Sequence, residues 1–240
     1  MASDFGLYRS TNSGGSWTEV LTGTVTDLVM DPSNHEVLYA AVRTVGISKS
    51  TDSGVTWNPA NTGFPVSNVG RVNLAIAPSN PQILLASVQH WTMNDLLGIW
   101  KTSDGAANWA RLAATGASCG VQCWYDMTLA VDPTNADVVY FGGISLFRSQ
   151  DGGATFSSIS GPIHVDQHIL VFDPSNPNVF YVGNDGGIYK TTNGGSTWVT
   201  LNTTLSITQF YSGISLHPTN PDIAMGGTQD NGTLGLYRHG

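Results

Sequence analysis

Two carboxylates in glycine-rich segments have the residue type and setting for chemistry. Asp185 lies in VGNDGGIYKT and Asp230 lies in GGTQDNGTLGLYR. Glycoside hydrolysis uses a pair of carboxyl groups, roughly 5 Å apart when the configuration is retained and roughly 6.5–9.5 Å apart when it is inverted. The alternative is structural, because Asn-Asp-Gly-Gly and Asp-Asn-Gly also form good turns. The sequence leaves both interpretations open and favours turn formation.

A second group of polar residues, in PIHVDQHILVFDP, contains His164, Asp166 and His168 ahead of an apolar run. Alternate residues of an extended strand share one face, so a His-x-Asp-x-His array could hold a metal ion. The other histidines are scattered along the chain, and none is placed nearby by the sequence. We therefore expect no metal here, and interpret the three residues as polar groups at a strand entry that contact a ligand.

The segment CWYDMTLAVDP adds Trp124, Tyr125 and Asp126 immediately before another apolar run. Aromatic rings stack on the apolar faces of sugars, and carboxylates accept hydrogen bonds from sugar hydroxyls. We expect these three residues, together with Gln229 beside Asp230, to contact a ligand.

The two cysteines, Cys119 and Cys123, lie just ahead of this segment in SCGVQCWYD. Two thiolates without a further Cys or His pair make only half a zinc site, so we predict a disulfide that closes a small loop. A disulfide, few lysines and a polar, uncharged surface together favour an extracellular, secreted protein.

A repeated phrase indicates how the chain positions these residues. The phrase STDSGVTW, here called the hairpin phrase, has five copies, which begin at Ser10, Ser50, Thr102, Ser149 and Thr191. It alternates with a turn phrase of the type Asp-Pro-Ser-Asn, whose copies begin at Asp31, Ala77, Asp132, Asp173 and His217. Neighbouring copies lie roughly 40 to 55 residues apart, which is the period of a propeller blade.

Each repeat contains four short apolar or aromatic-rich segments joined by turns, and helical periodicity is absent. The sequence therefore predicts an all-β fold, a β-propeller of four-stranded antiparallel blades that forms a single domain over 1–240. We predict five blades, with the N-terminal hairpin completing the last one, since closure removes exposed strand edges. The blades are expected at about 24–63, 70–115, 124–160, 166–204, and 208–240 plus 5–20.

The acidic position of the hairpin phrase is predicted to hold a turn rather than to act in a site. A short polar side chain in a tight hairpin can accept hydrogen bonds from backbone N–H groups. Two of the five copies carry asparagine, which keeps the acceptor but loses the charge that a metal ligand or a catalytic acid needs. The five residues are Asn12, Asp52, Asp104, Asp151 and Asn193.

Through these phrases the whole chain resembles the Asp-box, or BNR-repeat, propellers, which include sialidases, family 74 xyloglucan-cleaving endoglucanases and sortilin-like receptor domains. The resemblance implies that the hairpin phrase is a folding element remote from the ligand face. The segment around Asp185 is similar to a family 74 segment whose Asp is catalytic, with one residue deleted before it. The matching residues are Tyr181, Asp185, Gly186, Gly187, Tyr189 and Lys190. Family 74 enzymes draw their two acids from two propellers, whereas this chain has one.

Composition excludes several classes of partner. The net charge is -8, with only 9 Lys and Arg residues, so no basic run could neutralise nucleic-acid phosphates or an anionic membrane. No apolar stretch approaches the ~18 residues of a membrane span. The segment MASDFGLYRS lacks the apolar stretch of a signal peptide, so we expect any such peptide to have been removed. The arginine triad that the resemblance would require of a sialidase is not found.

These observations predict a secreted binding module, for carbohydrate at one mouth of the central channel, that needs no cofactor. One alternative is a family 74-like glycoside hydrolase that acts on β-glucan or xyloglucan through Asp185 and Asp230. The other is a protein-interaction scaffold or receptor-type propeller. The sequence favours binding over catalysis.

Overall fold

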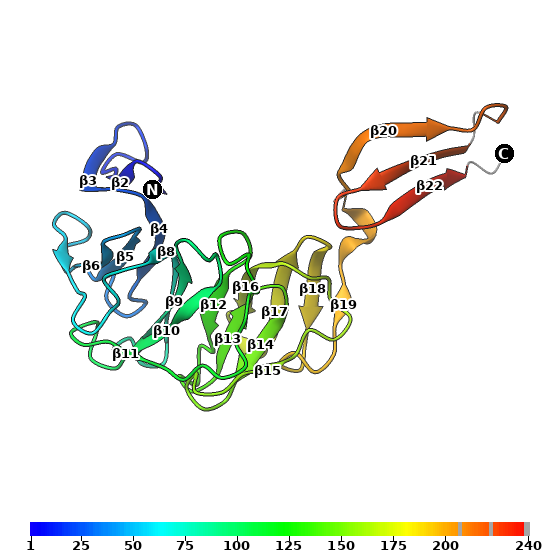
Figure 1. Cartoon of the computed structure of the whole chain (residues 1–240). Helices are drawn as coiled ribbons and strands as arrows, with labels where there is room; N and C mark the ends of the chain where they lie inside the picture. Colours follow the sequence, from blue (N-terminus) through cyan, green and yellow to red (C-terminus); the bar gives the residue numbers. More distant parts are fainter. Residues whose placement is uncertain (206–207, 221–222, 238–240) are drawn as a thin grey trace.

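Six antiparallel β-sheets follow one another in the computed structural model, which describes residues 1–205, 208–220 and 223–237. Four sheets have four strands each, joined in the order in which they occur in the chain, and lie side by side in an arc (Figure 1). Each strand pairs antiparallel with the next, so every sheet is a propeller-type blade. The all-β, propeller-like fold predicted from the repeat is confirmed.

The four complete blades are numbered I to IV along the chain. Blade I comprises β4 (Val25–Met30), β5 (Leu38–Val42), β6 (Gly46–Ser50) and β7 (Asn58–Pro59); blade II comprises β8 (Val69–Ile76), β9 (Leu84–His90), β10 (Leu96–Thr102) and β11 (Ala110–Arg111). Blade III comprises β12 (Thr128–Val131), β13 (Val139–Gly142), β14 (Leu146–Ser149) and β15 (Ser157–Ser158); blade IV comprises β16 (Gln167–Asp173), β17 (Asn176–Asn184), β18 (Gly187–Thr191) and β19 (Val199–Thr200).

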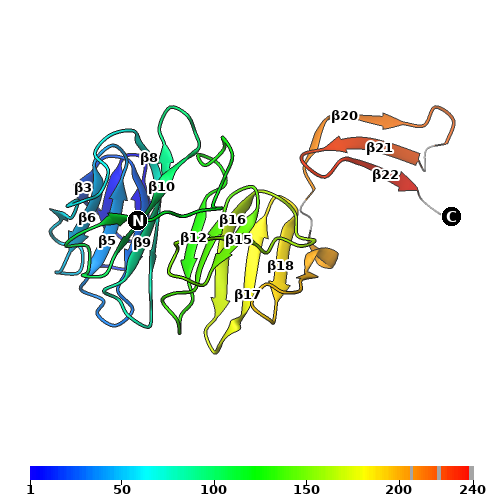
Figure 2. The ribbon, with the colours of Figure 1, turned by 60° about the horizontal axis from the view of Figure 1, so that its bottom comes forward.

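A three-stranded sheet lies at each end of the chain. The N-terminal sheet contains β1 (Ala2–Ser3), β2 (Gly6–Arg9) and β3 (Thr18–Thr22). A short 3-10 helix, η1 (Asn202–Thr204), precedes the C-terminal sheet of β20 (Phe210–Leu216), β21 (Ile223–Thr228) and β22 (Thr233–Tyr237). Seen from two sides, the C-terminal sheet stands away from the arc, at the opposite end from the N-terminal sheet (Figures 1 and 2).

The predicted closure into five blades is therefore not confirmed. The N-terminal hairpin forms a sheet of its own and does not complete the blade of β20–β22. The sequence contains the reason, because β2 carries the phrase GLYR and β22 ends on a copy of the same phrase, LGLY. The two ends thus share a third-strand position.

Apolar side chains fill the seams between blades. At the seam between blades I and II, Phe64 packs on Trp109 and Trp100, with ring centroids 5.4 and 5.7 Å apart. All three rings are buried, together with Tyr39 and most of β9. A similar aromatic group, with Tyr140 and Phe180 at its centre, joins blades III and IV. Seam packing of this kind fixes the position of each blade relative to its neighbours.

The hairpin phrase closes each outer hairpin through its acidic residue. In blade I, Asp52 Oδ1 accepts hydrogen bonds from the backbone N–H groups of Val55 and Thr56 at 3.0 and 2.9 Å, and Oδ2 accepts one from the Thr56 hydroxyl. The Ser50 hydroxyl also donates to Oδ1 at 2.7 Å. In the other four copies, Oδ1 likewise accepts a hydrogen bond from the backbone N–H four residues later. These copies carry Asn12, Asp104, Asp151 and Asn193. Asparagine thus makes the same backbone hydrogen bond as aspartate, as a turn-holding role requires.

Candidate functional site

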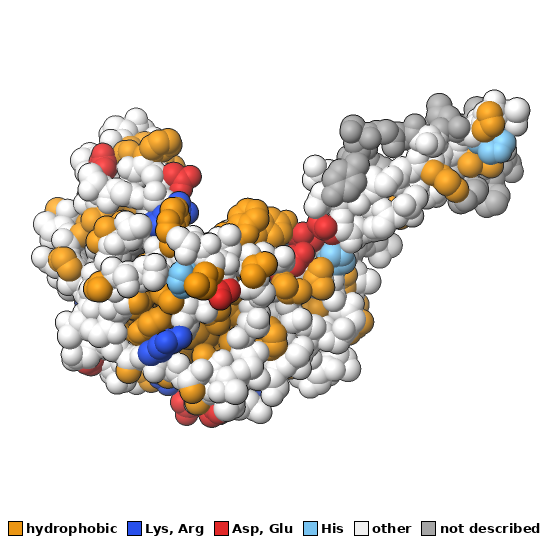
Figure 3. Space-filling view, in the orientation of Figure 1, with side chains coloured by type: hydrophobic (Ala, Val, Ile, Leu, Met, Phe, Trp, Pro, Cys, Tyr) orange, Lys and Arg blue, Asp and Glu red, His pale blue; other side chains and the backbone are white. Residues whose placement is uncertain are grey.

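A group of polar residues, here called the polar cluster, forms where blades III and IV meet the C-terminal sheet. It consists of Tyr125, His164, His168, Asp185 and Asp230. In an antiparallel blade the approach to the first strand and the turn between the second and third strands lie at the same end. The residues that precede β12, those around the start of β16 and the turns β17–β18 and β21–β22 therefore converge. Acidic and histidine side chains are visible at this junction in the space-filling view (Figure 3).

Asp185 is at the centre of the polar cluster. The Tyr125 hydroxyl lies 3.0 Å from both of its carboxylate oxygens, and His168 Nε2 lies 2.6 Å from Oδ1. Burial alone would raise the pKa of Asp185, but the hydrogen bonds from His168 and Tyr125 outweigh it and lower the pKa. Burial, followed by the Asp185 contact, raises the pKa of Tyr125 to about 12. Asp185 is therefore an ionised acceptor, and Tyr125 a neutral donor, at neutral pH.

Asp230 reaches the polar cluster from the C-terminal sheet. Its side chain lies close enough to Asp185 to be among the groups that lower the pKa of Asp185. His164 Nε2 contacts the backbone carbonyl oxygen of Asp230 at 2.9 Å, and the Gln229 side-chain amide donates to Asp230 Oδ2 at 2.8 Å. The structure therefore brings together the two carboxylates that the sequence singled out, although they come from different sheets.

A second pair of carboxyl groups lies behind the first. Gln122 Nε2 donates to Asp126 Oδ2 at 2.9 Å and to Asp166 Oδ1 at 2.5 Å, so it links two loops. Asp126 is fully buried. Burial, together with the nearby charge of Asp166, raises the pKa of Asp126 to about 7. The expected ligand contact of Asp126 is thus corrected: the side chain is enclosed and supports the loop that bears Tyr125.

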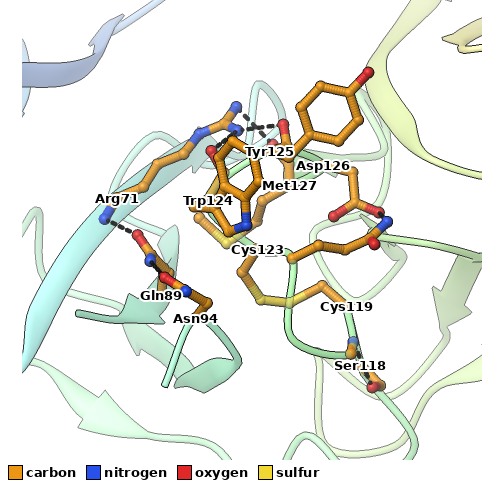
Figure 4. The surroundings of a disulfide bond; sticks show 12 residues. Arg71, Gln89, Asn94, Ser118, Cys119, Cys123, Trp124, Tyr125, Asp126 and Met127 are labelled. Atoms are coloured by element: carbon orange, nitrogen blue, oxygen red, sulfur yellow. Dashed lines mark hydrogen bonds between the residues drawn. A yellow bond between two sulfur atoms is a disulfide. The ribbon is translucent and has the colours of Figure 1, made fainter. Parts of the chain in front are cut away.

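The loop that carries the aromatic residues is fixed at two points (Figure 4). Cys119 and Cys123 are joined by a disulfide, and both side chains are fully buried. On the other side, the Arg71 guanidinium of β8 donates to the carbonyl oxygens of Tyr125 at 2.8 Å and Met127 at 3.0 Å. A loop held at both points presents its aromatic side chains in one defined position.

Trp124 and Tyr125 remain accessible on this loop. Their side chains are 58% and 41% exposed, and their ring centroids lie 5.6 Å apart. Tyr125 also meets the His168 ring edge to face at 4.9 Å. The three rings provide an apolar surface beside the ionised Asp185, the combination that sugar-binding sites use.

The sequence reasoning missed Gln122 and the role of Arg71. Gln122 lies between the two cysteines, and its place in that closed loop was the available signal. Arg71 had no local signal, because its partners are backbone carbonyls more than 50 residues further along the chain.

The site combines an ionised carboxylate, a second carboxyl group and exposed aromatic rings. Among residues 1–205, 208–220 and 223–237, no group of three or more His, Cys, Asp or Glu side chains is arranged to hold a metal ion. In the described part of the chain, no helix is long and apolar enough to span a membrane.

Comparisons with known proteins agree with the fold. The chain is 28% identical over 218 residues to a xyloglucanase of Hypocrea jecorina, an alignment that covers 80% of this chain and 24% of the relative. It superimposes on a GH74 enzyme of Niastella koreensis with a TM-score of 0.60 and 19% identity, covering 89% of this chain and 35% of that one. The structure of YCF48 bound to a D1 peptide also matches, with a TM-score of 0.56 and 17% identity, covering 97% of this chain and 71% of that one.

The chain spans about a quarter of the length of the curated relatives it matches. The comparisons support a GH74-like propeller, and they do not confirm the Asp-box, or BNR-repeat, assignment itself. The family model described as DUF6242 beta propeller domain matches residues 1–161, more than half of the sequence. The chain therefore belongs to the DUF6242 beta propeller domain family.

Proposed function

We propose that this chain binds a β-linked glucan of the xyloglucan type at the polar cluster and the neighbouring Trp124. The observation that carries the proposal is the Asp185 carboxylate, which Tyr125 and His168 hold ionised beside exposed aromatic rings. A fixed carboxylate accepts hydrogen bonds from sugar hydroxyls, and the rings stack on the apolar faces of the sugar. The xyloglucanase relatives support the choice of glucan.

A glycoside hydrolase remains the second candidate, since Asp185 and Asp230 lie near each other. Hydrolysis would require one carboxyl group to stay protonated as the acid and the other to lie across the bond that is cleaved. The lowered pKa of Asp185, which keeps this group ionised, favours binding instead. The predicted secretion of the protein is supported by the disulfide and by the low content of charged residues.

Calorimetric titration with xyloglucan oligosaccharides, with a parallel assay for released reducing ends, separates the two candidates. We expect saturable binding without turnover, and about tenfold weaker binding by Trp124→Ala, which removes a stacking surface. Trp91→Ala is the matched control, because Trp91 is a tryptophan of similar exposure (48%, against 58% for Trp124) outside the polar cluster. Turnover that Asp185→Asn abolishes would establish the hydrolase, and an absence of binding to any β-glucan would refute both candidates.

A further inference from the structure

The side of blade IV that faces away from blade III is here called the end face. It consists of Val171, Tyr181, Ile188, Lys190 and Leu205. Val171 of β16 is 50% exposed and Ile188 of β18 is 39% exposed. The residues at the position of Ile188 in blades I to III are fully buried beneath the blade that follows, namely Ile47, Ile99 and Leu146. The C-terminal sheet stands away from blade IV, so no described sheet covers the end face (Figures 1 and 2).

The loop after β19 completes the end face in the way that the loop after β7 completes blade I. Leu205 occupies the place of Phe64, because the backbone N–H of each donates to the carbonyl oxygen of the asparagine three residues earlier, at 3.0 and 2.9 Å. That asparagine side chain accepts a third-strand N–H, from Ile188 in blade IV and from Ile47 in blade I. Phe64 is 4% exposed since it packs on Trp109 of the following blade, whereas Leu205 is 40% exposed. Blade IV thus presents a seam surface without its second half.

Basic residues of the third strands bond each of three sheets to the next one. The acceptor is the carbonyl oxygen of the residue that follows the Asp or Asn of the hairpin phrase. These bonds run from Arg9 to Ser53 at 2.9 Å, from Lys49 to Gly105 at 2.8 Å and from Lys101 to Gly152 at 3.4 Å. Lys190 occupies this position in blade IV, with its nitrogen 5.3 Å from the Tyr181 ring centroid, yet it donates to no hairpin phrase among the described residues. The end face therefore has a cation without the acceptor that this position usually has.

The N-terminal sheet carries the matching acceptor. Its hairpin phrase places Ser13 where blade I has Ser53, and no basic side chain of the described residues donates to the Ser13 carbonyl oxygen. Trp17 ends this phrase and is 47% exposed, whereas Trp109 at the same position of blade II is 5% exposed. The N-terminal sheet and the end face lie at opposite ends of the arc, so they can meet only between two copies (Figure 1).

We propose that the end face of blade IV binds the N-terminal sheet of a second copy of this chain. Lys190 donates to the Ser13 carbonyl oxygen of that copy, and its Trp17 ring packs on Leu205 as Trp109 packs on Phe64. The contact continues the series of seams within the arc and buries apolar side chains that the single chain exposes. Because its two surfaces differ, the contact is head-to-tail and builds rings or filaments.

The C-terminal sheet of the same chain fits the end face less well. Its three strands include no hairpin phrase in the described part of the chain, so it offers Lys190 no acceptor of this kind. The contact of His164 Nε2 with the Asp230 carbonyl oxygen, at 2.9 Å, holds the β21–β22 turn while the sheet points away from the arc (Figure 1). The second copy needs neither a rearrangement nor a new hairpin.

Sedimentation velocity of the whole chain over a range of concentrations measures the contact. We expect the mass to rise above the 25.4 kDa of one chain, with a Kd on the order of 10 μM. Leu205→Asp puts a charge into the seam and should weaken association at least about tenfold. Lys190→Met keeps the alkyl chain over Tyr181 and should weaken it about fivefold. Val66→Asp is the control and should change nothing, because Val66 is exposed on the loop before β8, away from both surfaces.

A mixture of two variants tests the head-to-tail geometry and checks their folding. Trp17→Asp disables one surface and Leu205→Asp the other, so each variant alone should remain a single chain. Together they should form pairs and nothing larger, since each supplies the surface that the other lacks.

Three results would overturn the proposal. The first is a mixture that stays monomeric, or an unaltered chain that stays monomeric up to about 1 mM. The second is association that Leu205→Asp abolishes and Trp17→Asp leaves intact, which would assign the end face to a symmetric contact between two blades IV. The third is a mass that does not depend on concentration together with strong protection of the β18 amides from hydrogen exchange, which would assign the end face to the chain's own C-terminal sheet.

Discussion

The acidic position of the hairpin phrase has a structural role in this chain. Asp52, Asp104 and Asp151 each accept several hydrogen bonds within one hairpin. Hydrogen bonds from the neighbouring hydroxyl or amide side chain and from backbone N–H groups lower the pKa of each to about 2. The charge is therefore used for stability, and the two asparagine copies show that the acceptor oxygen alone also closes the turn.

A pH-dependence of stability follows from these lowered pKa values. A group whose pKa is about 2 in the folded chain and 3.8 in the unfolded chain stabilises the fold above about pH 4. That contribution is lost as the pH falls toward about 2. We expect the triple variant Asp52→Asn, Asp104→Asn, Asp151→Asn to show a flatter fall in stability over this range. Urea unfolding followed by circular dichroism measures it, and an unchanged slope would contradict the expectation.

Asp126 makes the stability of the folded chain depend on pH in the opposite direction. Its pKa is raised to about 7, mainly by burial, so its ionisation destabilises the folded chain as the pH rises from about 4 to about 7. Asp126→Asn carries no charge, and its amide can donate to Asp166. We expect the variant to unfold with a free energy higher by on the order of 2–4 kcal/mol at about pH 8. Near pH 4 the difference should vanish, and a constant difference at all pH values would contradict this account.

The loop from Cys119 to Met127 is the element that holds the residues of the site in place. It joins the disulfide, the Gln122 link to blade IV and the carbonyls that Arg71 holds. The sequence predicted that Tyr125, Asp185 and Asp230 lie near one another, because the repeat assigns their loops to one end of the blades. It could not predict that Asp126 turns inward, since that depends on Gln122 and on Asp166 of the next blade.

Removing the disulfide tests the importance of that loop. The closed loop is short, so Cys119→Ala with Cys123→Ala should lower the free energy of unfolding by only about 2 kcal/mol. We also expect the proposed glucan binding to weaken about tenfold, because Trp124 and Tyr125 lose their fixed position. Calorimetric titration beside a denaturant melt compares the two effects. Unchanged affinity in a folded double variant would mean that Arg71 alone fixes the loop.

At the scale of the whole molecule, the repeat predicted the blades but not how the chain ends. Each complete blade follows from one turn phrase and one hairpin phrase, which are local signals. Closure depends on contacts between the first and last sheets, and the copied third-strand phrase in β2 and β22 leaves neither end the partner of the other. Blades II and III therefore have complete neighbours on both sides, while the end sheets do not (Figures 1 and 2).

An arc of blades is a nearly one-dimensional array, in which stability rises with the number of packed neighbours. We expect amide hydrogen exchange to be slowest in β9, whose side chains are buried along almost its whole length, and slower there than in β2 by roughly a thousandfold, or ~4 kcal/mol. Native-state exchange followed by mass spectrometry measures both segments in one sample. Equal protection of the N-terminal sheet and blade II would mean that the array unfolds as a single unit, and would contradict the one-dimensional account.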